Sequence, residues 1–279
     1  MSRIDTLLIQ ARTQLSHSDS PRLDAELLLC QVLKVSRSYL FAHAHDELSP
    51  DQVQDFENLL ARRVAGEPIA YLLGKREFWS FTLKITPDVL IPRPDTELLV
   101  EQSLARLPEQ ARVLELGTGS GAIAIALAVE RPHCAVLATD ISQAALNLAQ
   151  ENAQSLALQT PRVQFMRSAW FAEIPAQQFD LIVSNPPYIA ADDPHLTQGD
   201  VRFEPYGALV AEAQGFSDLR EIIETGFHYL VTGGWVLLEH GYTQGAAVRG
   251  LLHAANYQQV ETYQDLAGLD RITVGRKLA

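Results

Sequence analysis

The alternation of short apolar runs with amphipathic stretches in the second part of the chain restricts its fold more than any other feature. Apolar runs of strand length end at Leu116, Thr139, Met166 and Ser184, and segments with helical spacing follow most of them. A strand, a helix and a second strand in succession form a right-handed crossover in a parallel sheet. We therefore predict an α/β domain. The expected strands are 113–116, 135–139, 163–166, 179–184, 235–239, 259–263 and 272–276, and the expected helices lie near 120–130, 142–154, 216–231 and 244–255.

The last two expected strands, 259–263 and 272–276, are separated by a loop that is too short for a crossover helix. Antiparallel strands can be joined by a short turn, whereas parallel strands need a long connection. We therefore expect a sheet of seven strands that is mostly parallel, with the last strand antiparallel.

The first 70 residues have the pattern of a small helical domain. Ser20 followed by Pro21, and Ser49 followed by Pro50 with Gln52 behind it, are start signals for two helices. A helical domain of this size can support the rest of the chain or dock a macromolecular substrate, and the sequence leaves both roles open.

Period-two hydrophobicity over 69–73, 78–83 and 89–91 predicts strands of a hairpin that connects two domains. Gly74 and Pro87 divide these segments. The expected domains are a helical domain at 1–70, a β-hairpin linker at 71–92 and the α/β domain at 93–279.

The charge and cysteine content exclude several classes of protein. With 22 basic and 34 acidic residues the formal net charge is −12, which argues against a broad phosphate-binding surface and against direct nucleic-acid binding. The two cysteines, Cys30 and Cys134, lie in separate apolar stretches, and no His or Cys cluster has zinc-ligand spacing, so we expect no metal. No apolar run reaches the roughly 18 residues that span a bilayer. We expect a cytoplasmic protein with no membrane contact.

Asn185, Pro186, Pro187 and Tyr188 follow the apolar run 179–184 directly. The prolines cannot continue a sheet ladder, so the chain is forced into a rigid loop at the carboxyl end of a strand. Ligands of open parallel sheets bind at that edge, which makes the loop, with its amide, carbonyls and aromatic ring, a candidate reaction site. Taken alone, the same residues also fit a Pro-rich exit turn with a structural asparagine.

A glycine-rich segment follows the first strand of the expected sheet and opens a helix. Its glycines allow a sharp turn and a close approach of the backbone to a ligand. The spacing is G-x-G-x-G, without the G-x-G-x-x-G of dinucleotide folds and without the Gly-Lys-Ser/Thr of a P-loop, so phosphate is not the obvious ligand. The candidate cofactor residues in this segment are Glu115, Gly117, Thr118, Gly119, Ser120 and Gly121.

Two further candidates follow the next two strands. Asp140 lies 19 residues beyond Gly121 and offers a carboxylate that can accept both hydroxyls of a ribose, although it could also cap the helix that follows. Trp170, with Phe171 beside it, could pack on an adenine or belong to the core. All of these groups follow strands of one sheet, which favours a nucleoside cofactor.

These motifs together resemble those of S-adenosylmethionine-dependent methyltransferases that modify planar amino nitrogens. Within that group, segments 74–78, 91–97, 115–121 and 201–205, with the helical N-terminal region, closely resemble the glutamine N5-methyltransferases that act on bacterial peptide chain release factors. The resemblance covers nearly the whole chain. One departure is Ala169, where an Asp beside the Trp is common in the family.

The resemblance implies a seven-stranded Rossmann-like methyltransferase sheet, S-adenosylmethionine as cofactor, and methyl transfer to the side-chain amide nitrogen of the glutamine in the GGQ motif of a release factor. Asn185, Pro186, Pro187 and Tyr188 are then the catalytic and substrate-binding residues, and Asn185 also contacts the cofactor. The Asn185 side-chain oxygen and the Pro186 carbonyl would accept hydrogen bonds from the substrate amide. We expect a monomer whose partner is a release factor. The alternative is an adenine N6-methyltransferase that acts on DNA or RNA.

Overall fold

The computed structural model describes residues 2–158 and 162–278, which form two compact units. The first unit, called here the helical unit, comprises Met1–Lys75 together with Thr197–Phe203. The second, the sheet unit, comprises Arg76–Leu196 and Glu204–Ala279. The chain therefore passes between the units three times, and the predicted domain boundaries do not include the return at 197–203.

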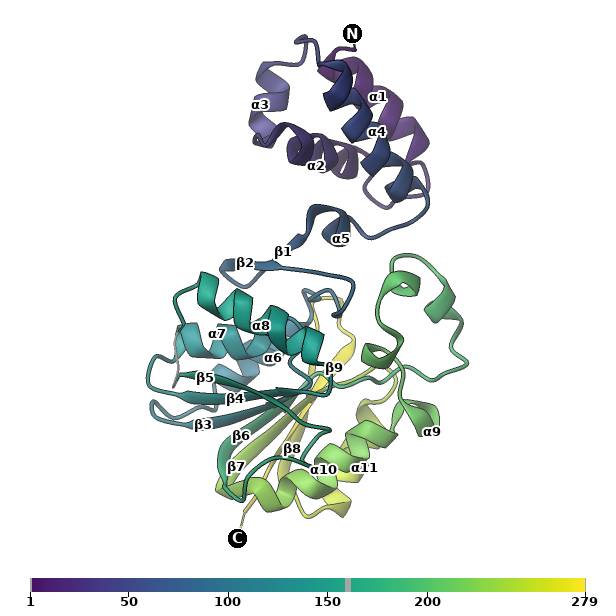
Figure 1. Ribbon diagram of the computed structural model, residues 1–279. Coiled ribbons are helices and arrows are strands. Elements are labelled where there is room, and N and C mark those ends of the chain that lie inside the picture. The colour runs from purple at the N-terminus through teal and green to yellow at the C-terminus, as the bar shows by residue number, and fades with distance from the viewer. Residues whose placement is uncertain (1, 159–161, 279) are drawn as a thin grey trace. The chain divides into compact units, whose positions relative to one another are not determined.

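The helical unit is built from short helices around a small apolar core (Figure 1). Its largest fully buried side chains include Phe56, Leu28 and Leu29. The predicted start signal at Ser49 is a complete capping box: the Ser49 hydroxyl accepts from the Gln52 N–H at 3.2 Å, and the Gln52 side chain accepts from the Ser49 N–H at 2.9 Å. The helices are α1 (Ile4–Gln14), α2 (Pro21–Leu33), α3 (Arg37–Ala42), α4 (Pro50–Val64) and α5 (Ile69–Leu73).

The segment 197–203 is held to this unit by two arginines. Arg63 of α4 donates to Asp24 of α2 at 2.7 Å and to Asp200 at 2.9 Å, and Arg202 donates to the Ala65 carbonyl at 2.7 Å. Asp24 and Arg63 are both largely buried. The pairing with two carboxylates compensates the Arg63 charge, so this arginine belongs to the interior of the unit rather than to a phosphate-binding surface.

The connection after α4 differs from the sequence prediction. Residues 69–73 form helix α5 rather than a strand, and Ala70, Tyr71 and Leu72 of this helix are buried. Gly74, at φ +67°, ends this helix. The hairpin consists of β1 (Lys75–Phe78) and β2 (Phe81–Lys84). The predicted strand at 89–91 is also wrong, since the Ile91 N–H donates to the Glu204 carboxylate at 3.1 Å instead of to a neighbouring strand.

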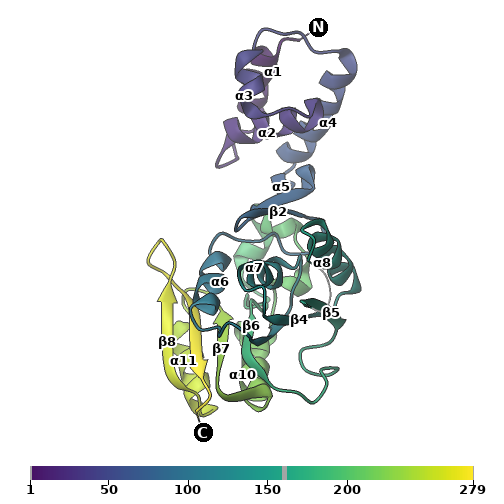
Figure 2. The ribbon, with the colours of Figure 1, turned by 90° about the vertical axis from the view of Figure 1, so that its left-hand side faces the viewer.

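The sheet unit contains a seven-stranded sheet in the order β5-β4-β3-β6-β7-β9-β8 (Figures 1 and 2). Neighbours from β5 to β7 pair in parallel, and β9 pairs antiparallel with both β7 and β8. The predicted α/β fold with an antiparallel last strand is confirmed. The strands are β3 (Arg112–Leu116), β4 (Ala135–Asp140), β5 (Val163–Arg167), β6 (Phe179–Ser184), β7 (Leu230–Glu239), β8 (Gln258–Gln264) and β9 (Asp270–Arg276).

Helices cover both faces of this sheet (Figure 1). On one face lie α6 (Thr96–Leu104), α7 (Ala122–Glu130) and α8 (Gln143–Ser155), and on the other lie α10 (Ser217–Tyr229) and α11 (Gly245–Ala254). A short helix, α9 (Glu212–Gly215), precedes α10. Parallel sheets are stable when both faces are buried, which explains the continuous apolar runs in the sequence.

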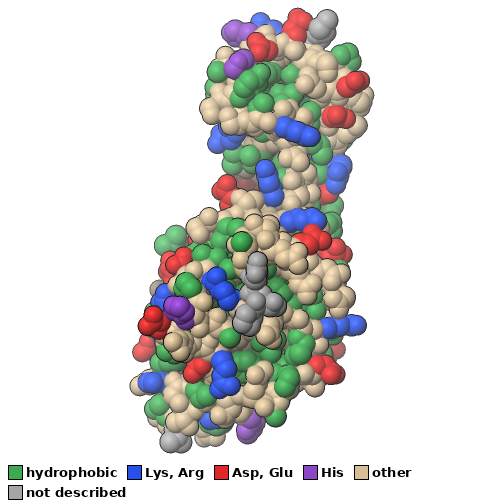
Figure 3. Space-filling view, turned by 60° about the vertical axis from the view of Figure 1, so that its left-hand side comes forward, with side chains coloured by type: hydrophobic (Ala, Val, Ile, Leu, Met, Phe, Trp, Pro, Cys, Tyr) green, Lys and Arg blue, Asp and Glu red, His purple; other side chains and the backbone are tan. Residues whose placement is uncertain are grey.

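Charged side chains are dispersed over the surface in view in Figure 3, where Lys and Arg lie among acidic and uncharged residues. A surface that tracks a phosphate backbone would gather positive charge into a stripe or patch. This face has none. Within the described residues, no helix combines the length and the apolar character that crossing a membrane requires.

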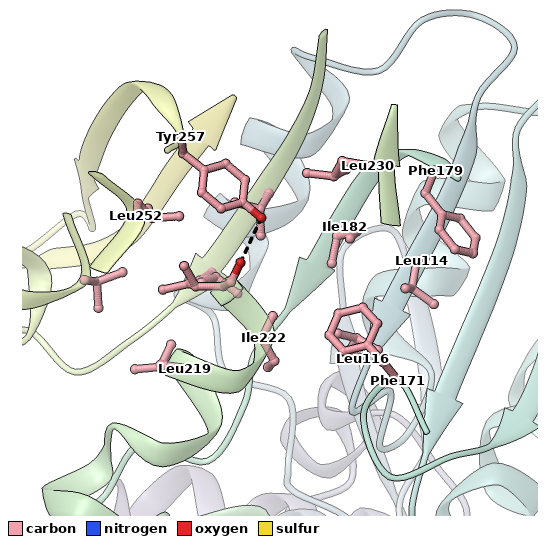
Figure 4. Close-up of a cluster of buried hydrophobic side chains, with 14 of the residues drawn as sticks. Leu114, Leu116, Phe171, Phe179, Ile182, Leu219, Ile222, Leu230, Leu252 and Tyr257 are labelled. Carbon is pink, nitrogen blue, oxygen red and sulfur yellow. Dashed lines mark hydrogen bonds between the residues drawn. The ribbon is translucent and has the colours of Figure 1, made fainter. Parts of the chain in front are cut away.

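One apolar core of the sheet unit, called here the α10–α11 core, lies between the sheet and the pair α10 and α11 (Figure 4). Leu114, Ile182 and Ile222 are fully buried there. Tyr257 is buried with them, and its hydroxyl donates to the Ile223 carbonyl at 3.1 Å, which satisfies the one polar atom of its ring. Leu114 of β3 and Ile182 of β6, which are paired in the sheet, both belong to this core.

The carboxyl ends of the parallel strands meet at one edge of the sheet. Leu116, the last residue of β3, is paired with Thr139 of β4 and with Ser184 of β6. Ser184 is paired in turn with Leu238, which precedes the end of β7. The residues that follow these strands are therefore neighbours in space, although they are far apart in the sequence.

Candidate active site

A cavity of about 410 Å³ lies at this edge of the sheet unit. Its size falls in the range of pockets that hold a cofactor or drug-sized molecule. It lies where the loops after β3, β4, β5 and β6 converge. Of the residues predicted from the sequence, Gly121, Pro186 and Tyr188 do not line it. Those that do are Glu115, Gly117, Thr118, Gly119, Ser120, Asp140, Trp170, Asn185 and Pro187.

The three glycines of the loop after β3 have different surroundings. All adopt positive φ, but a Cβ on Gly119 would meet no atom within 4 Å, whereas one on Gly121 would lie 3.1 Å from the Ala149 Cβ on α8. Gly119 therefore faces open space in the cavity, and Gly121 allows α7 to pack closely on α8. A ligand can approach the backbone at Gly119, as expected for a cofactor loop.

Glu115 lies below this loop and is 1% exposed. Its Oε2 accepts from the Thr118 hydroxyl at 2.6 Å and from the Ala124 N–H at 3.1 Å. Its Oε1 is buried and has no hydrogen-bond partner among the described residues. Burial raises the pKa of Glu115 to about 7. An acceptor without a partner at the wall of a cavity is suited to a donor group of a ligand.

Asp140, the last residue of β4, is oriented by two backbone groups. Its Oδ2 accepts from the Gly119 N–H and its Oδ1 from the Ser142 N–H, both at 2.9 Å. The cap of α8 is Ser142, whose hydroxyl accepts from the Ala145 N–H, so helix capping does not account for Asp140. Burial raises the pKa of Asp140 above its usual value. Each carboxylate oxygen keeps a further acceptor position, which is the number that two ribose hydroxyls require.

The aromatic pair after β5 divides between the site and the core. Trp170 lies on the cavity wall, and a Cβ on Gly117 would lie 3.6 Å from its ring. Phe171 is buried and stacks on Tyr229 with 4.9 Å between ring centroids. Asp218 of α10, a cavity residue that no sequence motif indicated, lies on the same cavity wall as Trp170, and burial raises the pKa of this carboxyl.

The loop after β6 begins at Ser184, whose hydroxyl donates to the Leu116 carbonyl at 2.7 Å and fixes the loop against β3. Asn185 then turns its Nδ2 toward the Thr96 hydroxyl at 3.3 Å. Among the described residues, no group donates to Asn185 Oδ1 or to the Pro186 carbonyl. The two acceptors predicted from the sequence are thus both without protein partners in this part of the chain.

Tyr188 lies differently from the other residues of this loop. Its side chain packs against the α10–α11 core, and its hydroxyl is 3.5 Å from Glu239 Oε1 at the end of β7. Burial and the Glu239 charge both raise the pKa of this phenol. Its carbonyl accepts from the Gln244 side chain at 3.1 Å. These contacts fix the end of the loop, and the substrate contact expected for Tyr188 stays a prediction.

An ion pair joins the two remaining motifs, 91–97 and 201–205. The Glu204 side chain is fully buried and accepts from the Arg93 guanidinium and from the Ile91 N–H. Arg93 also lines the cavity. Glu204 is therefore a salt-bridging residue between the two motifs. Removal of one residue of such an ion pair leaves the charge of the other buried without a counterion.

No group of three or more His, Cys, Asp or Glu side chains suited to a metal ion occurs in the part of the chain that the structure describes. The chain matches a family profile described as the methyltransferase small domain over residues 94–237. Among solved structures, a methyltransferase from Pyrococcus furiosus has the same fold, with a TM-score of 0.56, 20% identity, and coverage of 80% of this chain and 100% of that one. The fold and the site together define a methyltransferase with a Rossmann-like sheet.

The N-terminal region and the relatives of the whole chain narrow this class further. Residues 6–74 match the profile of the PrmC N-terminal domain. The release factor glutamine methyltransferase of Salmonella typhimurium strain LT2 is 53% identical over 270 residues, which cover 96% of this chain and 97% of the relative. The enzyme of the same name from Vibrio cholerae is 51% identical over 98% of this chain and 96% of its own length. The chain belongs to the release factor glutamine methyltransferase family.

Proposed function

We propose that this enzyme transfers a methyl group from S-adenosylmethionine to the side-chain amide nitrogen of the glutamine in the GGQ motif of a peptide chain release factor. The single observation that carries the proposal is the pair of acceptors in the loop after β6. Asn185 Oδ1 and the Pro186 carbonyl have no partner in the described residues, and Asn185 lines a cavity suited to a nucleoside cofactor. The names of the close relatives support the same substrate.

The residues on the cavity wall fit the proposed cofactor. The Asp140 carboxylate would accept the ribose hydroxyls, and the Trp170 ring would pack on the adenine. Glu115 Oε1, which is buried without a partner among the described residues, would accept from the donor groups of the cofactor's amino-acid end. When bound, the cofactor supplies an electrophilic methyl group on a sulfonium.

The substrate amide nitrogen is a poor nucleophile because its lone pair is delocalised into its carbonyl. Two acceptors that bind both of its N–H bonds hold the nitrogen in place and increase electron density on it. Pro186 and Pro187 fix the backbone on either side of one acceptor, so the carbonyl direction is set before the substrate binds. The positioning of nitrogen, methyl group and sulfur in line contributes up to about 7–11 kcal/mol in favourable systems. The proton can leave the nitrogen after transfer.

We propose a docking role for the helical unit, since a release factor is a macromolecular substrate and the site itself lies within the sheet unit. The net charge of −12 and the dispersed Lys and Arg side chains in Figure 3 favour a protein substrate over nucleic acid. The enzyme would act as a monomer on the release factor.

Transfer of radiolabelled methyl groups from the cofactor tests this function. We expect label in purified release factor and none in a release factor whose GGQ glutamine is replaced by alanine. Duplex DNA, single-stranded DNA and ribosomal RNA serve as the competing substrates. Label in a nucleic acid and none in the release factor would establish the adenine N6-methyltransferase alternative instead.

Cofactor affinity is expected to depend on pH through Glu115. The pKa of Glu115 is raised to about 7 by burial, and a donor bound at Oε1 favours the ionised form and lowers that pKa. Below pH 7 a proton must then leave on binding, so affinity rises with pH up to about 7, by at most about tenfold per pH unit, and is constant above it. Calorimetric titrations between pH 5.5 and 8.5 measure this.

Glu115→Gln has nearly the same shape and does not ionise. We expect its cofactor affinity to be weaker than that of the wild type above pH 7 and to lack the rise below it. An equal pH dependence in both proteins would show that Glu115 does not contact the cofactor.

A further inference from the structure

A buried carboxylate, Glu239, lies behind the loop that begins at Asn185. It is the last residue of β7, is 1% exposed, and does not line the cavity. Its Oε2 accepts from the Thr96 hydroxyl at 2.8 Å, and Thr96 is the first residue of α6. The Thr96 hydroxyl in turn accepts from Asn185 Nδ2 at 3.3 Å. A chain of hydrogen bonds therefore leads from the end of β7 to the amide in the cavity.

The direction of this chain follows from the number of protons available. An ionised carboxylate can only accept, so the single proton of the Thr96 hydroxyl is used on Glu239. The Thr96 oxygen then has only lone pairs left for its neighbour. Asn185 must present its NH2 group to Thr96, which directs its Oδ1 away from Thr96.

We propose that Thr96 and Glu239 are positioning residues that fix the orientation of the Asn185 amide, so that its oxygen rather than its NH2 group meets the amide to be methylated. This inference rests on the proposed function, in which Asn185 Oδ1 accepts from the substrate. A flipped Asn185 would present a donor to a substrate NH2 that can only donate. Two donors facing each other make no hydrogen bond, so the flipped form would be inactive.

The surroundings of Glu239 shift its pKa to near neutral pH. Burial raises its pKa to about 7, and the charge of Asp95 before α6 also raises it. Arg271 of β9, the Thr96 hydroxyl and Tyr188 lower it. Arg271 is itself paired with Asp265 at 2.9 Å and lies 3.5 Å from Asp95.

The adjacent histidine takes no part in this chain of hydrogen bonds. The His240 ring contacts Thr273 and the Gly241 carbonyl, at 2.7 and 2.9 Å. Glu239 is therefore the group of the chain that titrates. Below about pH 7 it becomes protonated and can donate to Thr96, which then no longer requires the NH2 group of Asn185.

The test uses Thr96→Val, which keeps the shape of the side chain and removes the hydroxyl, and Thr96→Ser, which keeps the hydroxyl. Ser103→Ala is the matched control, because it removes another buried hydroxyl of α6, one that donates to the Leu99 carbonyl at 2.7 Å. For each full-length enzyme, kcat and KM for the release factor are measured at saturating S-adenosylmethionine, and cofactor affinity is measured by calorimetry.

We expect kcat of Thr96→Val to fall by about tenfold to a hundredfold, the loss expected when an oriented hydrogen bond is removed. Its KM and cofactor affinity should change by less than about threefold, because the Thr96 hydroxyl is bonded to Glu239 and Asn185 and most of the binding surface of a protein substrate lies elsewhere. Thr96→Ser should recover most of the lost kcat, and Ser103→Ala should resemble the wild type.

Glu239→Gln provides the second readout, since it keeps the volume of the side chain and removes its titration. The kcat of the wild type should decrease as pH falls below about 7. The kcat of Glu239→Gln should not show this decrease, whether its absolute value is high or low. A wild-type kcat for Thr96→Val, a failure of Thr96→Ser to recover activity, or the same pH profile in Glu239→Gln would each overturn the positioning role. If the wild-type enzyme does not methylate a release factor, the proposed function itself fails.

Discussion

Replacement of Asn185 by alanine is expected to lower methyl transfer to a release factor by at least about a hundredfold to a thousandfold, the loss seen when one preorganised polar group of a reaction site is removed. The variant loses the acceptor that holds the substrate amide, while the groups proposed to bind ribose and adenine, Asp140 and Trp170, stay in place. Its cofactor affinity, measured by calorimetry, should remain within about threefold of the wild type, since only one wall contact is lost.

Asn147→Ala is the control for this experiment, because the Asn147 side chain is exposed on α8 and its one side-chain hydrogen bond among the described residues is with the Gln143 side chain. A methylation rate near that of the wild type for Asn185→Ala would contradict the proposed mechanism. A large loss of cofactor affinity in the same variant would show that the contact of Asn185 with S-adenosylmethionine, rather than with the substrate amide, is its main role.

Replacement of Asp140 by alanine is expected to raise the dissociation constant of S-adenosylmethionine by about a hundredfold, the value of two charge-assisted hydrogen bonds partly offset by water. The carboxylate also orients the Gly119 N–H at 2.9 Å, so the glycine loop loses a contact in the same variant. Asp140→Asn keeps one acceptor oxygen, so its dissociation constant for S-adenosylmethionine should lie between those of the wild type and Asp140→Ala. Isothermal titration calorimetry measures all three proteins.

Asp180→Ala is a matched control. Asp180 also accepts from a backbone N–H, that of Arg112 at 2.7 Å, but it lies near the start of β6 and outside the cavity. Its removal should leave the affinity for the cofactor unchanged. An unaltered affinity in Asp140→Ala would exclude the ribose contact.

The sheet and the groups after its strands could be predicted because their signals are local in the sequence. An apolar run such as 179–184 and the prolines after it determine a strand and its end without reference to any distant residue. Parallel pairing then brings Asp140 and the glycine loop to the same edge. Alternation, together with the motifs that follow the strands, therefore indicated nine of the residues that line the cavity.

The groups that no local pattern indicates are those that act through distant partners. Glu239 is one buried carboxylate at the end of an apolar strand, and only the pairing of β6 with β7 brings it near Tyr188. Asp218 belongs to a helix whose start resembles any other acidic first turn. Helix α5 was mistaken for a strand because five residues are too few to distinguish the two periods.

The return of residues 197–203 to the helical unit bears on how this enzyme could be recombined with its relatives. The two units are not two consecutive segments of the chain. Asp200 lies between two segments of the sheet unit in the sequence, but it belongs to the helical unit, where it contacts Arg63. A chimera that exchanged residues 1–75 alone would join a foreign α4 to a native 197–203. Grafting the helical unit therefore requires two inserts, residues 1–75 and residues 197–203, and the second lies between Tyr188 and Glu204 of the sheet unit.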